Sequence, residues 1–376
     1  MFAKTITVAD PEHRQMIRSG AGAFLEKRRP LSAVRTARDG GGFDRAFFRE
    51  LAEIGWLGMI FEEGTELNHE DLVALHRELG RKILPEPIIA SGVIAAAALW
   101  GSGNAAFASR LEALRAGEIV ATLAWQDRAG AVSSGDCGLV ATSEGGDWTL
   151  SGTCRFVPFA GLADHLVVAA GTGSGLLLGW LDVTAAGITL RPGEGIDHAQ
   201  LADIDFADVR LSAADVIAGP EAGAELLDRV LDLGRLAISA ELVGAAEAAF
   251  AMTLDYLKER KQFGRPIGAN QALQFEATNL FVQIELSNSV IANAARRFDG
   301  DPAERARLIA ACKARCSDMA FHTVRRCIQM HGAIGYTDAC DLSLFVKRVI
   351  QWTAWLGNGA AQRRRLQDIL LTSRAA

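Results

Sequence analysis

The residues best suited to chemistry stand in one short segment, Arg260–Gln271, with the sequence RKQFGRPIGANQ. It follows a long apolar helical pattern that Gly264 and Pro266 end, and a second helical pattern begins near Asn270. An arginine and a glutamine at such a corner can hold a pyrophosphate, because a planar guanidinium binds phosphate oxygens in pairs. The neighbouring Phe263 offers an apolar surface to a flat ring. The segment therefore predicts a grip for a dinucleotide, although Arg260 could also be a solvated charge at a helix end.

Three regions of different pattern must position this segment. Up to about residue 118, apolar residues recur at spacings of three and four, as in Phe43–Leu57 and Glu70–Leu84, which predicts helices. From 119 to 222, short runs of Val, Ile and Leu are separated by Gly, Asp and Ser, and Gly145–Asp147 is typical of a hairpin turn. From 223 onward four helical patterns follow, the first over Leu226–Lys261 and the last, Leu342–Leu370, with a break near Gly357–Gly359. The expected order is helices, a β domain and a four-helix unit.

Bulk properties exclude several classes of protein. The 376 residues carry a net charge of −6, which gives no basic face for nucleic acid. The longest apolar run, Ile88–Trp100, is shorter than the roughly 20 residues of a membrane span. The N-terminus, Met1–Thr5, lacks an apolar signal core, so we expect a cytoplasmic protein without membrane association. The six cysteines form no C-x-x-C pair; Cys312 and Cys316 share one helix face, and free thiols without a metal site are expected.

Several local matches together resemble the acyl-CoA dehydrogenase family over nearly the whole chain. The most specific are Glu259–Arg265 with Gln271, and Gln329–Thr337 (QMHGAIGYT); weaker ones are Leu51–Met59 and Leu79–Pro87. The resemblance implies an α+β fold with an N-terminal α-helical domain (1–118), a middle β-barrel-like domain (119–222) and a C-terminal four-helix bundle (223–376). It also implies FAD and the oxidation of an acyl-CoA thioester, in which a glutamate removes the α-proton while a hydride leaves the β-carbon.

The resemblance also implies roles for single residues. In the family, the segment at Arg260, Gln262, Phe263 and Gln271 reaches across a dimer interface to the pyrophosphate of the neighbour's FAD. The segment at Gln329 and Gly332 approaches the adenosine end of that FAD.

On the chain's own side, Phe156 keeps an aromatic surface for the flavin, and Arg235 is the expected substrate-binding residue. Pro158 and Ala360 stand where the family carries hydrogen-bonding residues, and Pro158 has no N–H to donate. The sequence thus keeps the residues that would contact the FAD of a neighbouring chain, whereas it lacks several of the residues that would contact FAD bound to this chain.

The catalytic glutamate of the family has no counterpart in this sequence. In one branch it precedes the last helix, where alignment places Asn358, and a shift of one residue gives only glycine. In another branch it precedes an arginine on the long helix, where Gly234 stands before Arg235. Neither residue can accept a proton near pH 7. Asp232 is expected to pair with Arg235, and Lys347-Arg348 and Arg363–Arg365 are expected on solvated helix faces or at CoA phosphates.

Three hypotheses follow. The first is an auxiliary subunit that supports the FAD site of a related acyl-CoA dehydrogenase chain. Such a subunit would form a dimer or tetramer, either with that related chain or with further copies of itself. The second is an active homomeric enzyme with an unconventional base, Glu241 or Asp127, and with electron-transfer flavoprotein as its partner. The third is a flavin-dependent oxidase or monooxygenase, or a binding protein, on the same fold.

Overall fold

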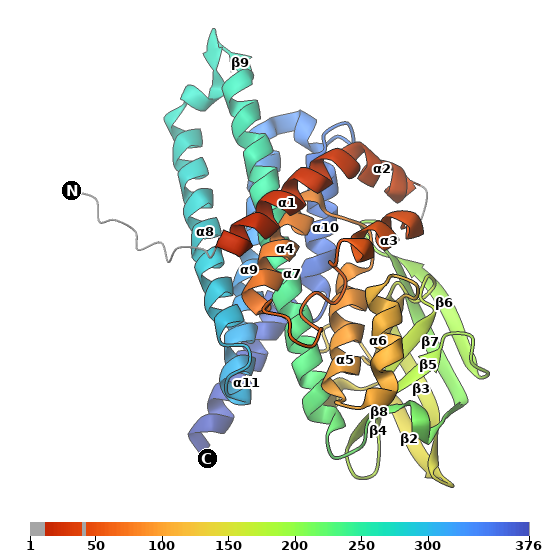
Figure 1. Cartoon of the computed structure of the whole chain (residues 1–376). Helices are drawn as coiled ribbons and strands as arrows, with labels where there is room; N and C mark the ends of the chain where they lie inside the picture. Colours follow the sequence, from red (N-terminus) through yellow and green to blue (C-terminus); the bar gives the residue numbers. More distant parts are fainter. Residues whose placement is uncertain (1–11, 40–42, 376) are drawn as a thin grey trace.

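The computed structural model describes residues 12–39 and 43–375, which form a helical N-terminal part, a central sheet and a C-terminal group of long helices (Figure 1). Residues 1–5, on which the cytoplasmic prediction depends, lie outside the described residues. The helices of the C-terminal part run side by side, and the sheet lies against one end of them (Figure 1).

The N-terminal helices begin where side chains cap them. The Asp44 carboxylate accepts hydrogen bonds from the backbone N–H groups of Ala46 and Phe47 at the start of α3, and Asn68 and Asp71 form a reciprocal capping box on α4. A π-helix, Ile88–Ala95, continues directly into α5 and holds most of the long apolar run, which is buried. The helices are α1 (Glu12–Arg28), α2 (Leu31–Asp39), α3 (Arg45–Glu53), α4 (His69–Lys82), α5 (Ala96–Gly101) and α6 (Ala108–Arg115).

The central sheet has eight strands in the order β6-β7-β3-β2-β4-β5-β8, and β1 pairs in parallel with β4. Most pairs are antiparallel, and Gly145 and Gly146, both with positive φ, form the predicted turn between β2 and β3. The strands are β1 (Ala121–Ala124), β2 (Leu139–Glu144), β3 (Asp147–Pro158), β4 (His165–Gly171), β5 (Leu176–Asp182), β6 (Ile188–Glu194), β7 (Gln200–Leu211) and β8 (Val216–Ala218). The middle part is therefore a mixed sheet.

The C-terminal part is helical except for a short hairpin, β9 (Lys261–Gln262) and β10 (Arg265–Pro266), between its first two helices. Its helices are α7 (Gly223–Glu259), α8 (Gln271–Arg296), α9 (Pro302–His331), α10 (Leu342–Ala354) and α11 (Gly359–Ala375). The last two are separated at residues 355–358, which confirms the predicted break. The predicted fold class, α+β with helical, β and helical parts in this order, is confirmed.

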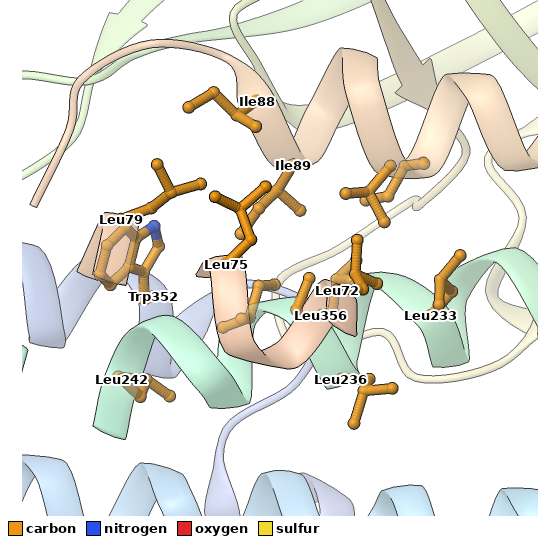
Figure 2. Packing of buried hydrophobic residues seen from close by; sticks show 14 of the residues in the cluster. Leu72, Leu75, Leu79, Ile88, Ile89, Leu233, Leu236, Leu242, Trp352 and Leu356 are labelled. Atoms are coloured by element: carbon orange, nitrogen blue, oxygen red, sulfur yellow. The ribbon is translucent and has the colours of Figure 1, made fainter. Parts of the chain in front are cut away.

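Two glycines let α4 and α7 approach each other closely. A Cβ added to Gly80 would overlap the carbonyl oxygen of Glu241, and one added to Gly244 would overlap the carbonyl oxygen of Arg77. Glycine is needed here because the backbones themselves touch. Leucines of both helices fill the adjoining space with Ile88, Ile89, Trp352 and Leu356 (Figure 2). Each such side chain, when fully buried, contributes about 1.5–3 kcal/mol.

Helix α7 positions both candidate sites. Its 37 residues span about 55 Å, so Gly234 and Arg235 lie in its first third while its far end carries the Arg260 corner. It is the one helix in the described ranges that is long and apolar enough to cross a membrane, and 78% of its most apolar window is buried inside the protein. Its apolar surface is thus covered by the chain's own helices.

Candidate functional site

A cavity of about 290 Å³ lies between the sheet and the C-terminal helices. Phe156 and Pro158 of β3 form its sheet side; Trp352, Trp355 and Asn358 form its helix side, around the break between α10 and α11. Ligand pockets in proteins commonly begin at about 300 Å³ and are mostly apolar with a few polar groups. The size and the aromatic lining of this cavity, called here the ring cavity, fit a flat ring.

Phe156 reaches the ring cavity because β3 bulges there. The register between β3 and β7 shifts between Cys154 and Val157, and Phe156 has a positive φ of 55°. A bulge of this kind re-aims a side chain. The Phe156 ring is 47% exposed, and its backbone N–H donates to Asp203 Oδ1 at 2.9 Å. The predicted aromatic surface is therefore present in the cavity wall.

Polar groups around the ring cavity are largely bonded within the protein. The side-chain amide of Gln126 donates to the Arg155 carbonyl at 3.0 Å, and the Pro158 carbonyl accepts from Thr122 Oγ1 at 2.8 Å. In the adjoining loop, the N–H groups of Val132 and Ser133 donate to Asp136, and that of Ser134 donates to Asp228. The wall of the ring cavity therefore offers an apolar surface for the face of a flavin ring but few unused polar groups for the hydrogen-bonding edge of that ring.

Asn358 lies at the ring cavity but acts as a helix cap. Its Oδ1 accepts from the Ala361 N–H at 2.9 Å, and its carbonyl accepts from the Gln362 N–H. Leu356, two residues earlier, is buried and has a positive φ of 57°. The side chain that points from this loop toward α7 is therefore that of Leu356.

Gly234 faces Leu356 across a nearly filled space. A Cβ added to Gly234 would lie 2.8 Å from Leu356 Cδ1 and 2.8 Å from Ile94 Cδ1. The compartment between Ile94, Leu356 and the Thr122 strand measures only about 10 Å³, which is the room of about one water molecule. The side chains of Leu356 and Ile94 thus occupy the space beside Gly234, whereas Asn358 lines the ring cavity.

Among the described residues, no Asp or Glu lines either the ring cavity or this compartment. Glu241 lies at the α4–α7 contact and bonds to His76 Nδ1 at 2.8 Å; burial raises the pKa of Glu241, although His76 opposes this. Asp127 pairs with Arg128 on the surface at 2.8 Å. Neither of the two alternative bases named from the sequence lies in a cavity wall.

Arg235 is fully buried and is held by protein groups alone. It donates to Asp232 Oδ1 at 2.9 Å, to the Leu356 carbonyl at 3.1 Å and to the Val132 carbonyl. The predicted pairing with Asp232 is confirmed. Burial, with the nearby charge of Arg365, lowers the pKa of Arg235 to about 10. Through these hydrogen bonds Arg235 holds the loop at Leu356 in place. A direct contact between Arg235 and a substrate stays a prediction.

Lys313 is a second buried cation beneath the same loop. Its Nζ donates to the carbonyls of Trp352 and Thr353 at 3.1 Å, to Gly357 at 3.2 Å and to Ser317 Oγ. Burial lowers its pKa to about 7. The sequence analysis missed this residue, whose only signal was a lysine between Cys312 and Cys316 on an apolar helix face.

Two of the basic residues expected on solvated faces are buried instead. Arg348 is bonded to Asp197 of the β6–β7 hairpin at 3.0 Å, and Arg365 to Asp232 of α7 at 2.8 Å. The expectation was wrong for these two because each finds a carboxylate on an element remote in sequence. Arg348 also lines the ring cavity.

The Arg260 corner is a small hairpin at the far end of α7 (Figure 1). Lys261 and Gln262 pair with Arg265 and Pro266, and the tip is formed by Phe263 (φ 51°) and Gly264 (φ 81°). Phe263 is fully exposed; Arg260, Gln262 and Gln271, the first residue of α8, are exposed too. These side chains line neither the ring cavity nor the compartment behind it.

The second predicted segment lies beside this corner. His331, at the end of α9, stacks on Tyr256 of α7 with ring centroids 4.3 Å apart, and the Tyr256 hydroxyl donates to the His331 carbonyl. Tyr256 is one turn before Arg260. Gln329 is exposed, and Gly332, with φ 69°, has open space around its Cα. The structure therefore brings the two predicted dinucleotide segments together on one end of the molecule.

All six cysteines are free, and four of them are buried. Within residues 12–39 and 43–375, no group of three or more His, Cys, Asp or Glu side chains is arranged to hold a metal ion.

Family models match the two helical parts of the chain. The acyl-CoA dehydrogenase N-terminal domain matches residues 11–117, and the acyl-CoA dehydrogenase C-terminal domain matches residues 221–371.

Similar proteins span almost the whole chain. The short-chain specific acyl-CoA dehydrogenase of Megasphaera elsdenii is 28% identical over 338 residues, which are 84% of this chain and 86% of that protein. Acyl-CoA dehydrogenase IpdE2 of Mycobacterium tuberculosis is 28% identical over 366 residues, 95% of this chain and 97% of that one. Among solved structures, a variant of the Tcur3481-Tcur3483 steroid ACAD has a TM-score of 0.88 at 27% identity, over 97% of this chain and 99% of that chain.

The order of helices, sheet and helices, the matched domains and the similarity over nearly the full length agree with one another. The chain belongs to the acyl-CoA dehydrogenase family.

Proposed function

We propose that this chain is an acyl-CoA dehydrogenase-like flavoprotein subunit that supports FAD-dependent oxidation of an acyl-CoA thioester without supplying the catalytic base. The observation that carries the proposal is the lining of the ring cavity and of the compartment behind it, which among the described residues contains no Asp or Glu. Removal of a weakly acidic α-proton needs an ionised group held within hydrogen-bond reach of that proton.

The filled compartment supports the same proposal. Ile94 and Leu356 each lie 2.8 Å from a Cβ added at Gly234, and the compartment that these two side chains line together with the Thr122 strand holds only about 10 Å³. An acyl group would have to displace these side chains, which pack in the main hydrophobic core. A base restored at residue 234 would meet the same obstacle, because even a Cβ there lies too close to both neighbours.

FAD, when bound, accepts the hydride in this chemistry. On this chain, Phe156 offers a ring face, whereas the polar groups beside it are bonded within the protein. At the far end of α7, several exposed side chains have no such hydrogen bonds within the described part of the chain. They are Arg260, Gln262, Phe263 and Gln271, with Gln329 and Gly332 beside them. We assign them to the pyrophosphate and adenosine ends of an FAD whose flavin lies on a neighbouring chain.

An apolar surface adjoins this corner and would receive that neighbour. Phe275, Phe281, Val282 and Leu286 of α8, with Phe321 of α9, are all exposed. Helix α8 lies on the side of the molecule remote from the sheet (Figure 1). Large exposed apolar side chains gathered on one helix mark a protein interface. The similar steroid ACAD bears two component names, Tcur3481 and Tcur3483, and we propose a related acyl-CoA dehydrogenase chain as the partner.

The test is to purify the chain alone and together with a co-encoded relative. The proposal predicts little flavin and no anaerobic bleaching by acyl-CoA for the chain alone, and flavin with bleaching for the pair. Full flavin loading and dehydrogenase activity of the isolated chain would overturn it and would make electron-transfer flavoprotein the expected electron acceptor. Oxygenated product from reduced flavin and oxygen would instead identify a monooxygenase.

A further inference from the structure

A second cavity, of about 200 Å³, lies between α5 and the first turns of α7. It is called here the α5–α7 cavity. Ala97 and Trp100 line it from α5, and Val230 and Leu233 line it from α7. It shares no lining residue with the ring cavity. Gly234 follows Leu233 but packs against Ile94 and Leu356, so a wall of packed side chains separates the two spaces.

Aromatic rings form much of the α5–α7 cavity. Phe61 and Trp100 lie with ring centroids 6.3 Å apart, and Phe298 closes another side. Phe61, Phe298 and Val230 are buried, whereas Trp100 is 42% exposed at the opening. The indole of Trp100 is thus partly open to solvent beside a buried apolar floor, and pockets for small ligands are typically lined by such apolar and aromatic side chains. The floor and the rim together would accept a flat, largely apolar molecule.

Four polar side chains, Asn68, His69, Arg229 and Asp299, also line this cavity. Asp299 bonds to Arg229 NH2 at 2.6 Å and to His69 Nδ1 at 3.2 Å, and these two partners hold the pKa of Asp299 well below its usual range. Asp299 is the one acceptor recorded for Arg229 among the described residues. The carboxylate therefore fixes the guanidinium at the cavity while its other N–H groups remain available.

The charges also decide which ligand suits the site. Arg229 lies 5.4 Å and Arg305 lies 5.8 Å from the centre of the Phe298 ring. A cationic ligand would compete with these two guanidinium groups for the same aromatic surface. Asp299 already balances the charge of Arg229, so a ligand carboxylate would be held through hydrogen bonds from the remaining N–H groups of Arg229 rather than through a net positive charge.

We propose that the α5–α7 cavity binds a small aryl or alicyclic carboxylic acid, with its ring against Phe61 and Trp100 and its carboxylate on Arg229. About 200 Å³ admits a single ring with a short acid group and not a CoA thioester. The inference is independent of the proposed function, because the site lies outside the ring cavity and needs neither flavin nor a partner chain.

Binding is tested by titrating the isolated chain with benzoate, and with benzyl alcohol as the neutral analogue, while tryptophan fluorescence and binding heat are followed. We expect saturable benzoate binding that is several-fold tighter than that of benzyl alcohol, and a fluorescence change that disappears in Trp100→Phe. Arg229→Gln should weaken benzoate at least about fivefold and remove the preference for the acid. Arg297→Gln is the matched control, since Arg297 is a similarly exposed arginine paired with Glu304 outside the cavity.

Ala97→Phe should fill the cavity and abolish binding, and its circular dichroism shows whether it folds. Should that variant fail to fold, Arg229→Gln, which changes a partly exposed side chain, still decides the matter. Absence of saturable binding, or binding that Arg229→Gln leaves unchanged, would overturn the proposal.

Discussion

Gly234 and Leu356 face each other so closely that a single Cβ at 234 would lie 2.8 Å from Leu356 Cδ1. These residues come from the first third of α7 and from the loop between α10 and α11. Gly234 is one of the two positions at which the family resemblance places a base, and the space in front of it is taken up by Leu356 rather than by Asn358, the other position, which lines the ring cavity. In this chain, a leucine fills that space and a glycine makes room for it.

This contact predicts that Gly234→Ala destabilises the chain. Overpacking of a well-filled core costs about 1–3 kcal/mol, and the added methyl meets both Ile94 and Leu356. Leu356→Ala in the same chain should recover part of that loss, because it removes one of the two clashes. Urea denaturation of the wild type, the two single variants and the double variant gives the coupling.

The matched control is Gly20→Ala in α1, where an added Cβ meets nothing within 4 Å. It should be neutral or stabilising, because alanine restricts the unfolded chain more than glycine does. Equal effects at residues 20 and 234 would contradict the packing described here.

Asn358 is expected to matter for stability rather than for chemistry. Its Oδ1 accepts from the Ala361 N–H at the start of α11, so Asn358→Ala should cost about 0.5–2 kcal/mol. Asn358→Asp keeps an acceptor and should stay near the wild type. Thermal unfolding of the three proteins checks this, and an unchanged midpoint for Asn358→Ala would show that the cap is unimportant.

Lys313 should give the stability a characteristic dependence on pH. Burial lowers the pKa of Lys313 from its ordinary value of 10.5 to about 7 in the folded chain. Between these values the unfolded chain binds more protons, so the free energy of unfolding should rise as pH rises from about 7, by at most about 1.4 kcal/mol per unit. Below pH 7 both states are protonated and this contribution to the slope disappears.

Lys313→Met should flatten this rise between pH 7 and 8.5, as measured by denaturation at several pH values. Lys258→Met is the control, because Lys258 is exposed and pairs with Asp255. An identical slope in wild type and Lys313→Met would show that Lys313 keeps an ordinary pKa.

The Arg260 corner should matter for a complex and not for the fold. Arg260→Ala and Phe263→Ala alter exposed side chains of a projecting hairpin, so the free energy of unfolding of the isolated chain should change by less than about 0.5 kcal/mol. The flavin content of the co-purified pair should fall in both variants. Lys258→Met again serves as a control, and unchanged flavin in Arg260→Ala would remove the corner from the cofactor site.

Much of the fold was predictable because the helices carry strong periodic patterns. The long α7, the start of α8 and the break before α11 follow from Leu226–Lys261, from the Gly264–Pro266 stop and from Gly357–Gly359. The bounds and pairing of the strands did not follow from the sequence, since mixed polar and apolar residues such as those of β7 and β8 become strands only through pairing with β3 and β5.

The candidate site was predictable only in part. The sequence indicated that a base was absent, but it pointed to Asn358, whereas the side chain opposite Gly234 is that of Leu356. Which residue of a short loop turns inward depends on a positive φ at Leu356 and on carbonyl contacts to Arg235 and Lys313. Such contacts join residues more than 40 positions apart and leave no local pattern.

The most direct measurement is the flavin-to-protein ratio of the isolated chain, together with anaerobic bleaching of that flavin by acyl-CoA. The account predicts a ratio far below one, no bleaching for the chain alone, and both flavin and bleaching when a base-bearing relative is present. One flavin per chain that acyl-CoA bleaches in the absence of any partner would contradict it.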